Sequence, residues 1–162
     1  MSSYADALLE FYTGEVLGEA VYSGLLAAAR SDDERLKWAT LLQLETETKA
    51  WLRVPLVARG VSVVEQPADR ANGAAAAEQL KTQPWNVQMQ ALQGTIKNDF
   101  VPRYQAHADA ARARGASDEE AVCRAMVEHE QAQLEFAERE LAGDRTGSLE
   151  PVTKLLRFPL GR

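Results

Sequence analysis

Residues Gly60–Gln83, GVSVVEQPADRANGAAAAEQLKTQ, decide which helical fold the chain adopts, because they separate two pairs of long helical patterns. The segment holds Pro67, Asn72 and Gly73, followed by an alanine-rich stretch, Ala74–Leu80, that favours a short helix. A helix of about 28 residues is roughly 42 Å long, and the segment is long enough to travel back along it. We therefore expect the helices before and after this crossover to run parallel.

Start and stop signals on both sides of the crossover predict four long helices. Ser31 stands three residues before Glu34, and Ser117 three before Glu120, the capping-box spacing that satisfies free amides in a first turn. Pro84 fits a further helix start. The helices are expected to end before glycines that can take the left-handed conformation, which are Gly60, Gly115 and Gly143. They cover residues 3–30, 32–59, 84–114 and 118–142.

The short outer connections make each pair of helices an antiparallel hairpin. Pro55 is expected to kink the second helix or to end it early. The sequence thus predicts an all-α, antiparallel four-helix bundle with one long crossover over residues 1–143. The tail, residues 144–162, is apolar enough to pack on the bundle or on a partner. A faint repeat supports two similar hairpins, because Leu44–Thr48 (LETET) resembles Val127–Gln131 (VEHEQ).

Composition limits the possible partners. The chain has 162 residues, of which 46% are hydrophobic and 26% charged, as in one globular domain. Its net charge of −6 would repel nucleic acid and anionic membranes, so neither is expected as a partner. Cys123 is the only cysteine and cannot form an intramolecular disulfide. Met1–Asp6 lacks a signal-peptide pattern and no stretch is apolar enough to span a bilayer, so we expect a cytoplasmic protein.

Each predicted long helix places an acidic residue within an apolar stripe. Glu47 is central on the second helix, Asp99 follows Leu92 and Ile96 on the third, and Glu130 lies between Val127 and Leu134 on the fourth; Glu15 and Glu19 share a face of the first. The pairs have similar spacings, 32 residues from Glu15 to Glu47 and 31 from Asp99 to Glu130, which predicts similar heights in the two hairpins. Glu45 lies on a neighbouring apolar stripe of the second helix.

Carboxylates that face one core require a cation or shared protons, because an unpaired buried charge is costly. The alternative for any single acid is a place at the solvated edge of the bundle, paired with a base such as Arg103 or Lys49. Pro102 removes a backbone hydrogen bond and is expected to kink the third helix beside Asp99. Gly14 and Gly18 flank Glu15 and permit close helix approach or ligand access.

This organisation resembles the ferritin-like superfamily, especially its rubrerythrin and bacterioferritin-like members, over about residues 3–142. The resemblance implies two metal ions, usually iron, held by one glutamate from each of the first and third helices and a Glu-x-x-His from each of the others. Such a centre reacts with oxygen or peroxide. On this basis the expected metal ligands are Glu15, Glu19, Glu47, Asp99, Glu130 and His129.

The histidines of that motif are missing. Ala50 stands three residues after Glu47, and Gln133 three after Glu130, while the two histidines, His107 and His129, occupy neither position. A site rich in carboxylates favours harder ions such as Mn²⁺ or Mg²⁺.

Two functions follow from these features. The first is a di-metal protein, with iron or manganese, that serves as an oxidoreductase or oxygenase of a small apolar substrate. The second is a relative with a vestigial site and no metal, which serves as a binding or oligomerisation module. In either case we expect a homo-oligomer, most simply a homodimer. A haem bundle is disfavoured, because nothing places the rings of His107 and His129 opposite each other.

Overall fold

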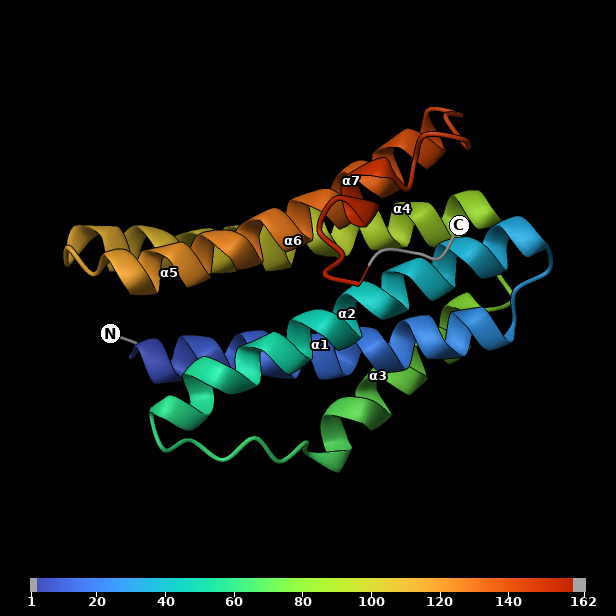
Figure 1. Ribbon diagram of the computed structural model, residues 1–162. Coiled ribbons are helices and arrows are strands. Elements are labelled where there is room, and N and C mark those ends of the chain that lie inside the picture. The colour runs from blue at the N-terminus through green and yellow to red at the C-terminus, as the bar shows by residue number, and fades with distance from the viewer. Residues whose placement is uncertain (1–2, 159–162) are drawn as a thin grey trace.

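The computed structural model describes residues 3–158, in which all regular structure is helical, as the sequence predicts (Figure 1). Residues 1–2 and the end of the predicted tail, residues 159–162, lie outside the described residues. The helices, in chain order, are α1 (Tyr4–Ala27), α2 (Asp32–Ala58), α3 (Pro67–Leu80), α4 (Trp85–Thr95), the π-helix η1 (Ile96–Phe100), α5 (Val101–Ala113), α6 (Ser117–Leu141) and α7 (Glu150–Thr153).

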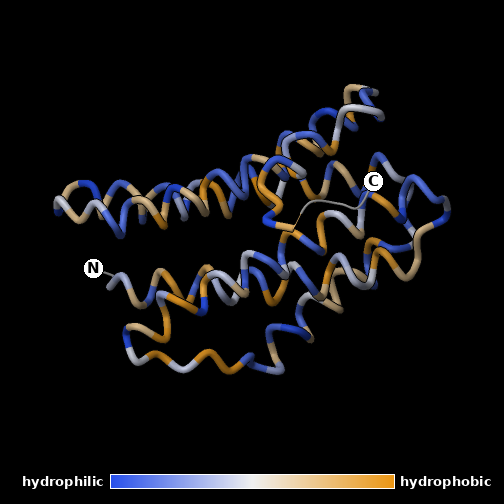
Figure 2. Tube along the Cα trace, in the orientation of Figure 1, coloured by the Kyte–Doolittle hydropathy of each residue, from blue (hydrophilic) through white to orange (hydrophobic). Residues whose placement is uncertain are grey.

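Helices α1 and α2 form one antiparallel hairpin, and the continuous helix α4–η1–α5 forms a second with α6 (Figure 1). The chain runs in the same direction along α2 and along α4–α5, with α3 in the connection between them (Figure 1). Hydrophobic and hydrophilic residues are interspersed along the long helices (Figure 2).

The glycine stop signals are confirmed. Gly60, Gly115 and Gly143 follow the ends of α2, α5 and α6 with φ of 69°, 69° and 87°, which are left-handed conformations. Pro55 lies inside α2, which continues to Ala58, so the expectation of an early end was wrong.

The helix starts follow the predicted caps only in part. Ser31 caps α2, because its hydroxyl accepts from the amide of Glu34 at 3.1 Å. The predicted capping box at Ser117 does not form. Helix α6 begins at Ser117 itself with Ala116 as its cap, and Glu120 pairs with Arg112 and Arg124.

Helix α3 begins at Pro67, earlier than the predicted short helix, and packs along α1. The two backbones approach closely at Gly73, where a Cβ atom would lie 2.4 Å from the carbonyl oxygen of Leu17. Glycine is therefore required at this contact, and the crossover covers one side of α1.

Apolar residues gather in two clusters along the bundle. One cluster includes Leu8, Phe11, Leu52, Tyr104 and Met126. The other includes Tyr22, Trp38, Met89, Phe136 and Val152. On α1 and α6 the buried polar residues Glu15, Glu19, His129 and Glu130 lie in sequence between members of the two clusters.

The π-helix changes which side of the third long helix faces the core. The amide of Val101 donates to the carbonyl of Ile96, five residues back, and Pro102 has no amide to donate. Before the wide turn Met89 and Ile96 are buried; after it the buried residues are Tyr104, Ala108 and Ala111. The kink expected beside Asp99 thus takes the form of a π turn.

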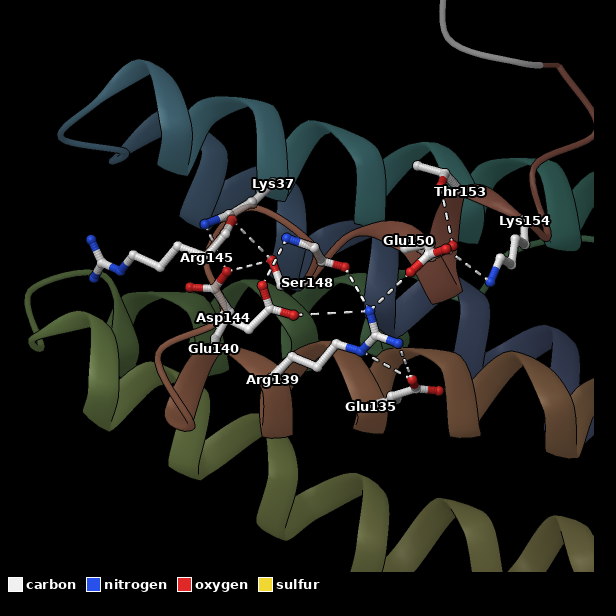
Figure 3. Close-up of polar contacts among 11 residues, drawn as sticks. Lys37, Glu135, Arg139, Glu140, Asp144, Arg145, Ser148, Glu150, Thr153 and Lys154 are labelled. Carbon is white, nitrogen blue, oxygen red and sulfur yellow. Dashed lines mark hydrogen bonds and ion pairs between the residues drawn. The ribbon is translucent and has the colours of Figure 1, made fainter.

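The segment after α6 is anchored on the bundle by a buried ion pair (Figure 3). Lys37 of α2 lies 2.6 Å from Glu140 of α6, and both side chains are almost fully buried. Ser148 also donates to Glu140, and Arg139 donates to the carbonyl of Gly147 at 2.9 Å (Figure 3). These contacts hold the loop between α6 and α7.

Candidate metal centre

Three helices contribute to a buried polar cluster, which we call the carboxylate cluster. It consists of Glu15 from α1, Glu45 from α2, and His129, Glu130 and Gln133 from α6, each with at most 7% of its surface exposed. His129 and Gln133 are one turn apart on α6 and therefore share a face. The cluster thus lies in the interior of the protein, between the α1–α2 hairpin and α6 of the second hairpin.

His129 is the centre of the closest contacts. Its Nε2 lies 3.1 Å from Glu45 Oε1 and 3.4 Å from Glu15 Oε1. Gln133 Nε2 lies 2.8 Å from Glu45 Oε1 and 2.8 Å from His129 Nε2. Ligand-type atoms of Glu15, Glu45 and His129 all lie within 4.8 Å of one another, which is close enough for one ion to contact all three.

A second layer of side chains orients these groups. Thr48 Oγ1 lies 3.2 Å from His129 Nδ1, so the other ring nitrogen faces the carboxylates. The hydroxyl of Tyr22 donates to Gln133 Oε1, which turns the amide nitrogen of Gln133 toward Glu45. The ring of His129 and the carboxylate of Glu45 are therefore held in fixed orientations.

Glu15 has two buried oxygens, and neither has a hydrogen-bond partner among the described residues. Burial and the nearby charges of Glu45 and Glu130 raise the pKa of Glu15 well above its ordinary value. Carboxylate oxygens accept but do not donate, so two adjacent carboxylates require a proton or a cation between them.

The other members of the cluster also have shifted pKa values. Burial raises the pKa of Glu130 to about 8; the charge of His129 opposes this shift and that of Glu45 adds to it. Burial lowers the pKa of His129, but the charge and hydrogen bond of Glu45 outweigh burial, and the net pKa lies above its ordinary value. The cluster therefore holds protons that ordinary carboxyl groups lose at neutral pH.

The glycines that flank Glu15 allow side chains of other helices to lie close to the backbone of α1. A Cβ atom at Gly18 would lie 2.0 Å from Glu45 Oε2, and one at Gly14 would lie 2.4 Å from the hydroxyl of Tyr104. Gly18 thus admits the carboxylate of Glu45 against α1.

The structure does not bring Glu47 into the cluster. Glu47 instead accepts from the backbone amides of Arg157 and Phe158 and from the side chain of Gln43. Helix geometry explains the difference, because residues two apart point about 200° apart and Glu45 already faces the core.

Glu19 and Asp99 also lie apart from the cluster. Glu19 pairs with Lys49 and Arg70 and accepts from Thr46. Asp99 is exposed and pairs with Arg103 at 2.9 Å, because the π turn directs it away from the core. The alternative stated above, an acid paired with a base at the edge of the bundle, describes both residues.

His107, the other histidine, lies beside Glu10 at 2.8 Å and packs against the ring of Phe11. It has no contact with the carboxylate cluster. Glu45 was the residue that the expected ligand set omitted, although its apolar stripe identified it as a candidate.

An apolar pocket of about 140 Å³ adjoins the carboxylate cluster. Helices α1, α3 and α4 and the π-helix line it, and Glu45, Glu130 and Gln133 form its polar end. The wide turn of η1 contributes Ile96 and Phe100 to the wall. The arrangement is a partly open, mainly apolar pocket whose lining includes buried carboxyl groups.

Comparisons of the chain with protein-family models, with curated proteins and with solved structures found no match. None of the helices within residues 3–158 combines the length and the apolar character that a membrane span requires.

Proposed function

We propose that Glu15, Glu45 and His129 bind one divalent metal ion, iron or manganese, and that the protein is an oxidoreductase of a small molecule held in the adjacent pocket. The main support for this proposal is the environment of the Glu15 carboxyl group. This group is buried, has no hydrogen-bond partner among the described residues, and lies 3.4 Å from His129. A cation at this point would satisfy Glu15 and Glu45 together.

The donor set fits such an ion. Two carboxylates favour manganese and other hard ions, and an imidazole adds affinity for iron. Thr48 and Gln133 supply the outer hydrogen bonds that usually orient metal ligands. When bound, iron or manganese supplies one-electron redox chemistry and reactivity toward oxygen or peroxide.

The residues of the chain have separate roles in this proposal. Glu15 and His129 release protons to become ligands, because a metal binds the carboxylate and the neutral imidazole. Gln133, held by Tyr22, orients Glu45. The burial of the carboxylate cluster limits the access of water and strengthens its electrostatic interactions.

The proposal is for one ion, whereas the resemblance implies two. Glu47 and Asp99, which were expected to complete a second site, have partners elsewhere. Two hairpins joined by a crossover, with α2 and α4–α5 running in the same direction, support a ferritin-like bundle as the scaffold.

Metal titration tests the proposal. Protein purified without chelators is analysed for its elements, and metal-free protein is titrated anaerobically with Fe²⁺ and with Mn²⁺. We expect one ion per chain. Glu15→Gln should lower the affinity at least about tenfold, because it keeps the shape of the side chain and removes its charge.

Glu47→Gln is the matched control, because Glu47 is also a buried glutamate but contacts the C-terminal segment. Its metal affinity should equal that of the wild type. If neither metal binds, or if Glu15→Gln binds as tightly as the wild type, the metal centre is excluded. The metal-free binding or oligomerisation module, with a proton shared between Glu15 and Glu45, is then the better description.

A further inference from the structure

The apolar pocket has the size and lining of a site for a small organic molecule. A cavity of about 140 Å³ is close to the roughly 150 Å³ that accommodates benzene in an engineered protein core. Its walls include Leu25, Trp38, Leu92, Ile96 and Phe100. The size limits the occupant to a single ring or a short chain with a small substituent.

The polar end of the pocket is acidic. Among the described residues that line it, none is basic, and two are glutamates, Glu45 and Glu130. Glu45 already accepts a hydrogen bond from Gln133 and contacts His129. An anionic molecule would be repelled by this end.

The carboxyl group of Glu130 has hydrogen-bonding capacity that no other residue of the protein satisfies within residues 3–158. Its side chain lines the pocket, the residue is 6% exposed, and no described residue hydrogen-bonds or ion-pairs with it. The charges of His129 and Arg103 act on it through space only. Arg103 itself pairs with Glu10 and Asp99.

We propose that the pocket binds a small apolar primary amine, with its ammonium group on Glu130 and its apolar body between Trp38 and Phe100. An ammonium donates a charge-assisted hydrogen bond to Glu130, which a hydrocarbon cannot do. Trp38 and Phe100 line the pocket and offer aromatic surface to the apolar part. A neutral hydrocarbon of the same shape would leave a buried acid without a donor.

As an assignment of substrate class, this inference rests on the proposed function. As a statement about binding, it does not need the metal, because Glu130 is outside the group formed by Glu15, Glu45 and His129. Binding is therefore measured on metal-free, chelator-treated full-length protein. Loss of metal binding and loss of amine binding are then separate results.

The test compares benzylamine, toluene, benzyl alcohol and benzoate by calorimetry and by ligand-observed NMR. The titrations are run at several pH values below the pKa of benzylamine itself, so that its ammonium form is present. We expect benzylamine to bind roughly tenfold or more tightly than toluene and benzyl alcohol. Benzoate should not bind.

Two variants locate the site. Glu130→Gln should remove the preference for benzylamine over toluene, while Glu128→Gln, an exposed glutamate of the same helix, should keep it. Ala91→Phe, at a partly exposed position of the wall, should fill the pocket and abolish binding of both ligands. Circular dichroism checks that each variant is folded.

Three results would overturn the proposal. The first is that none of the four compounds binds the wild type. The second is that toluene or benzyl alcohol binds as tightly as benzylamine. The third is that the amine preference survives Glu130→Gln in a folded variant.

Discussion

His129 Nε2 lies 3.1 Å from Glu45 Oε1, although 84 residues separate the two side chains in the sequence. This contact joins the second helix of one hairpin to the second helix of the other. It also brings together the two related segments, Leu44–Thr48 and Val127–Gln131, that the sequence repeat singled out. The faint repeat thus marks the place where the two halves of the molecule share a polar centre.

Metal binding should release protons. Glu15 and His129 both have raised pKa values in the metal-free protein, so at neutral pH each favours its protonated form more than an exposed residue would. Their deprotonation is coupled to binding, and metal affinity should rise with pH. Calorimetric titration with Mn²⁺ in two buffers of different ionisation enthalpy should show release of at least one proton per ion. Equal heats in both buffers would contradict the assigned ligands.

The stability of the metal-free protein should fall as the pH rises through about 8. The folded state keeps a proton on Glu130 between its ordinary pKa of 4.5 and about 8, whereas the unfolded state releases it. The stabilisation from this proton is complete below the lower value and is lost as the pH rises through the upper value. The slope is up to about 1.4 kcal/mol per pH unit for this one group.

Denaturant unfolding of wild type, Glu130→Gln and Glu128→Gln across this pH range measures the effect. Glu130→Gln should have a shallower pH dependence than the wild type, and Glu128→Gln should match the wild type. A slope that is the same in all three proteins would show that Glu130 is not held protonated.

Gly18→Ala should destabilise the protein by about 1–3 kcal/mol and weaken metal binding. The added Cβ would lie 2.0 Å from Glu45 Oε2, so the carboxylate must move away from α1. Gly94 of α4 is the matched control, because no atom lies within 4 Å of a Cβ built there. Gly94→Ala should be neutral or stabilising by up to about 1 kcal/mol. Thermal melts that rank the two variants in the reverse order would count against the close approach.

Lys37→Met should cost about 3–5 kcal/mol, because it leaves Glu140 as a buried charge without its cation. The double variant Lys37→Met/Glu140→Gln should recover part of that loss. Lys81, whose exposed ion pair with Glu78 is worth little, provides the control. A cost below about 0.5 kcal/mol for Lys37→Met, as expected for Lys81→Met, would show that the pair in Figure 3 does not anchor the C-terminal segment.

The helices were predictable from sequence because their ends depend on local chemistry. Gly60, Gly115 and Gly143 permit a left-handed residue at the position where each helix ends, and this requirement does not depend on tertiary packing. The predicted ends agree with the structure to within three residues for each long helix. The capping box at Ser117 failed, because an arginine on either side competes for Glu120.

The carboxylate cluster was less predictable, because neighbouring stripes on a helix differ by only about 100°. The sequence placed Glu47 at the centre of the apolar stripe of the second helix, yet Glu47 contacts the C-terminal segment and Glu45 faces the carboxylate cluster. On α6 the predicted stripe ran through Val127, Glu130 and Leu134. Val127 and Glu130 are buried but Leu134 only partly so, and the buried face extends to a neighbouring stripe, Met126, His129, Gln133 and Phe136. The rotation of each helix depends on its neighbours, and periodicity alone does not contain that information.

The wide turn at Ile96–Phe100 has a consequence for insertions and deletions in this region. It allows Ile96 before the turn and Tyr104 after it to face inward on the same side, and Tyr104 then packs 4.6 Å from the ring of Phe11. Ile96 and Tyr104 are eight residues apart, and an ordinary α-helix would direct two such residues about 80° apart. Removal of one residue from the turn would restore an ordinary α-helix and leave them seven residues apart, within about 20° of the same direction, so Tyr104 would still face Phe11. The wide turn is therefore the position in this helix at which the loss of one residue should be tolerated, whereas a loss elsewhere in α5 would rotate the residues after it by about 100°.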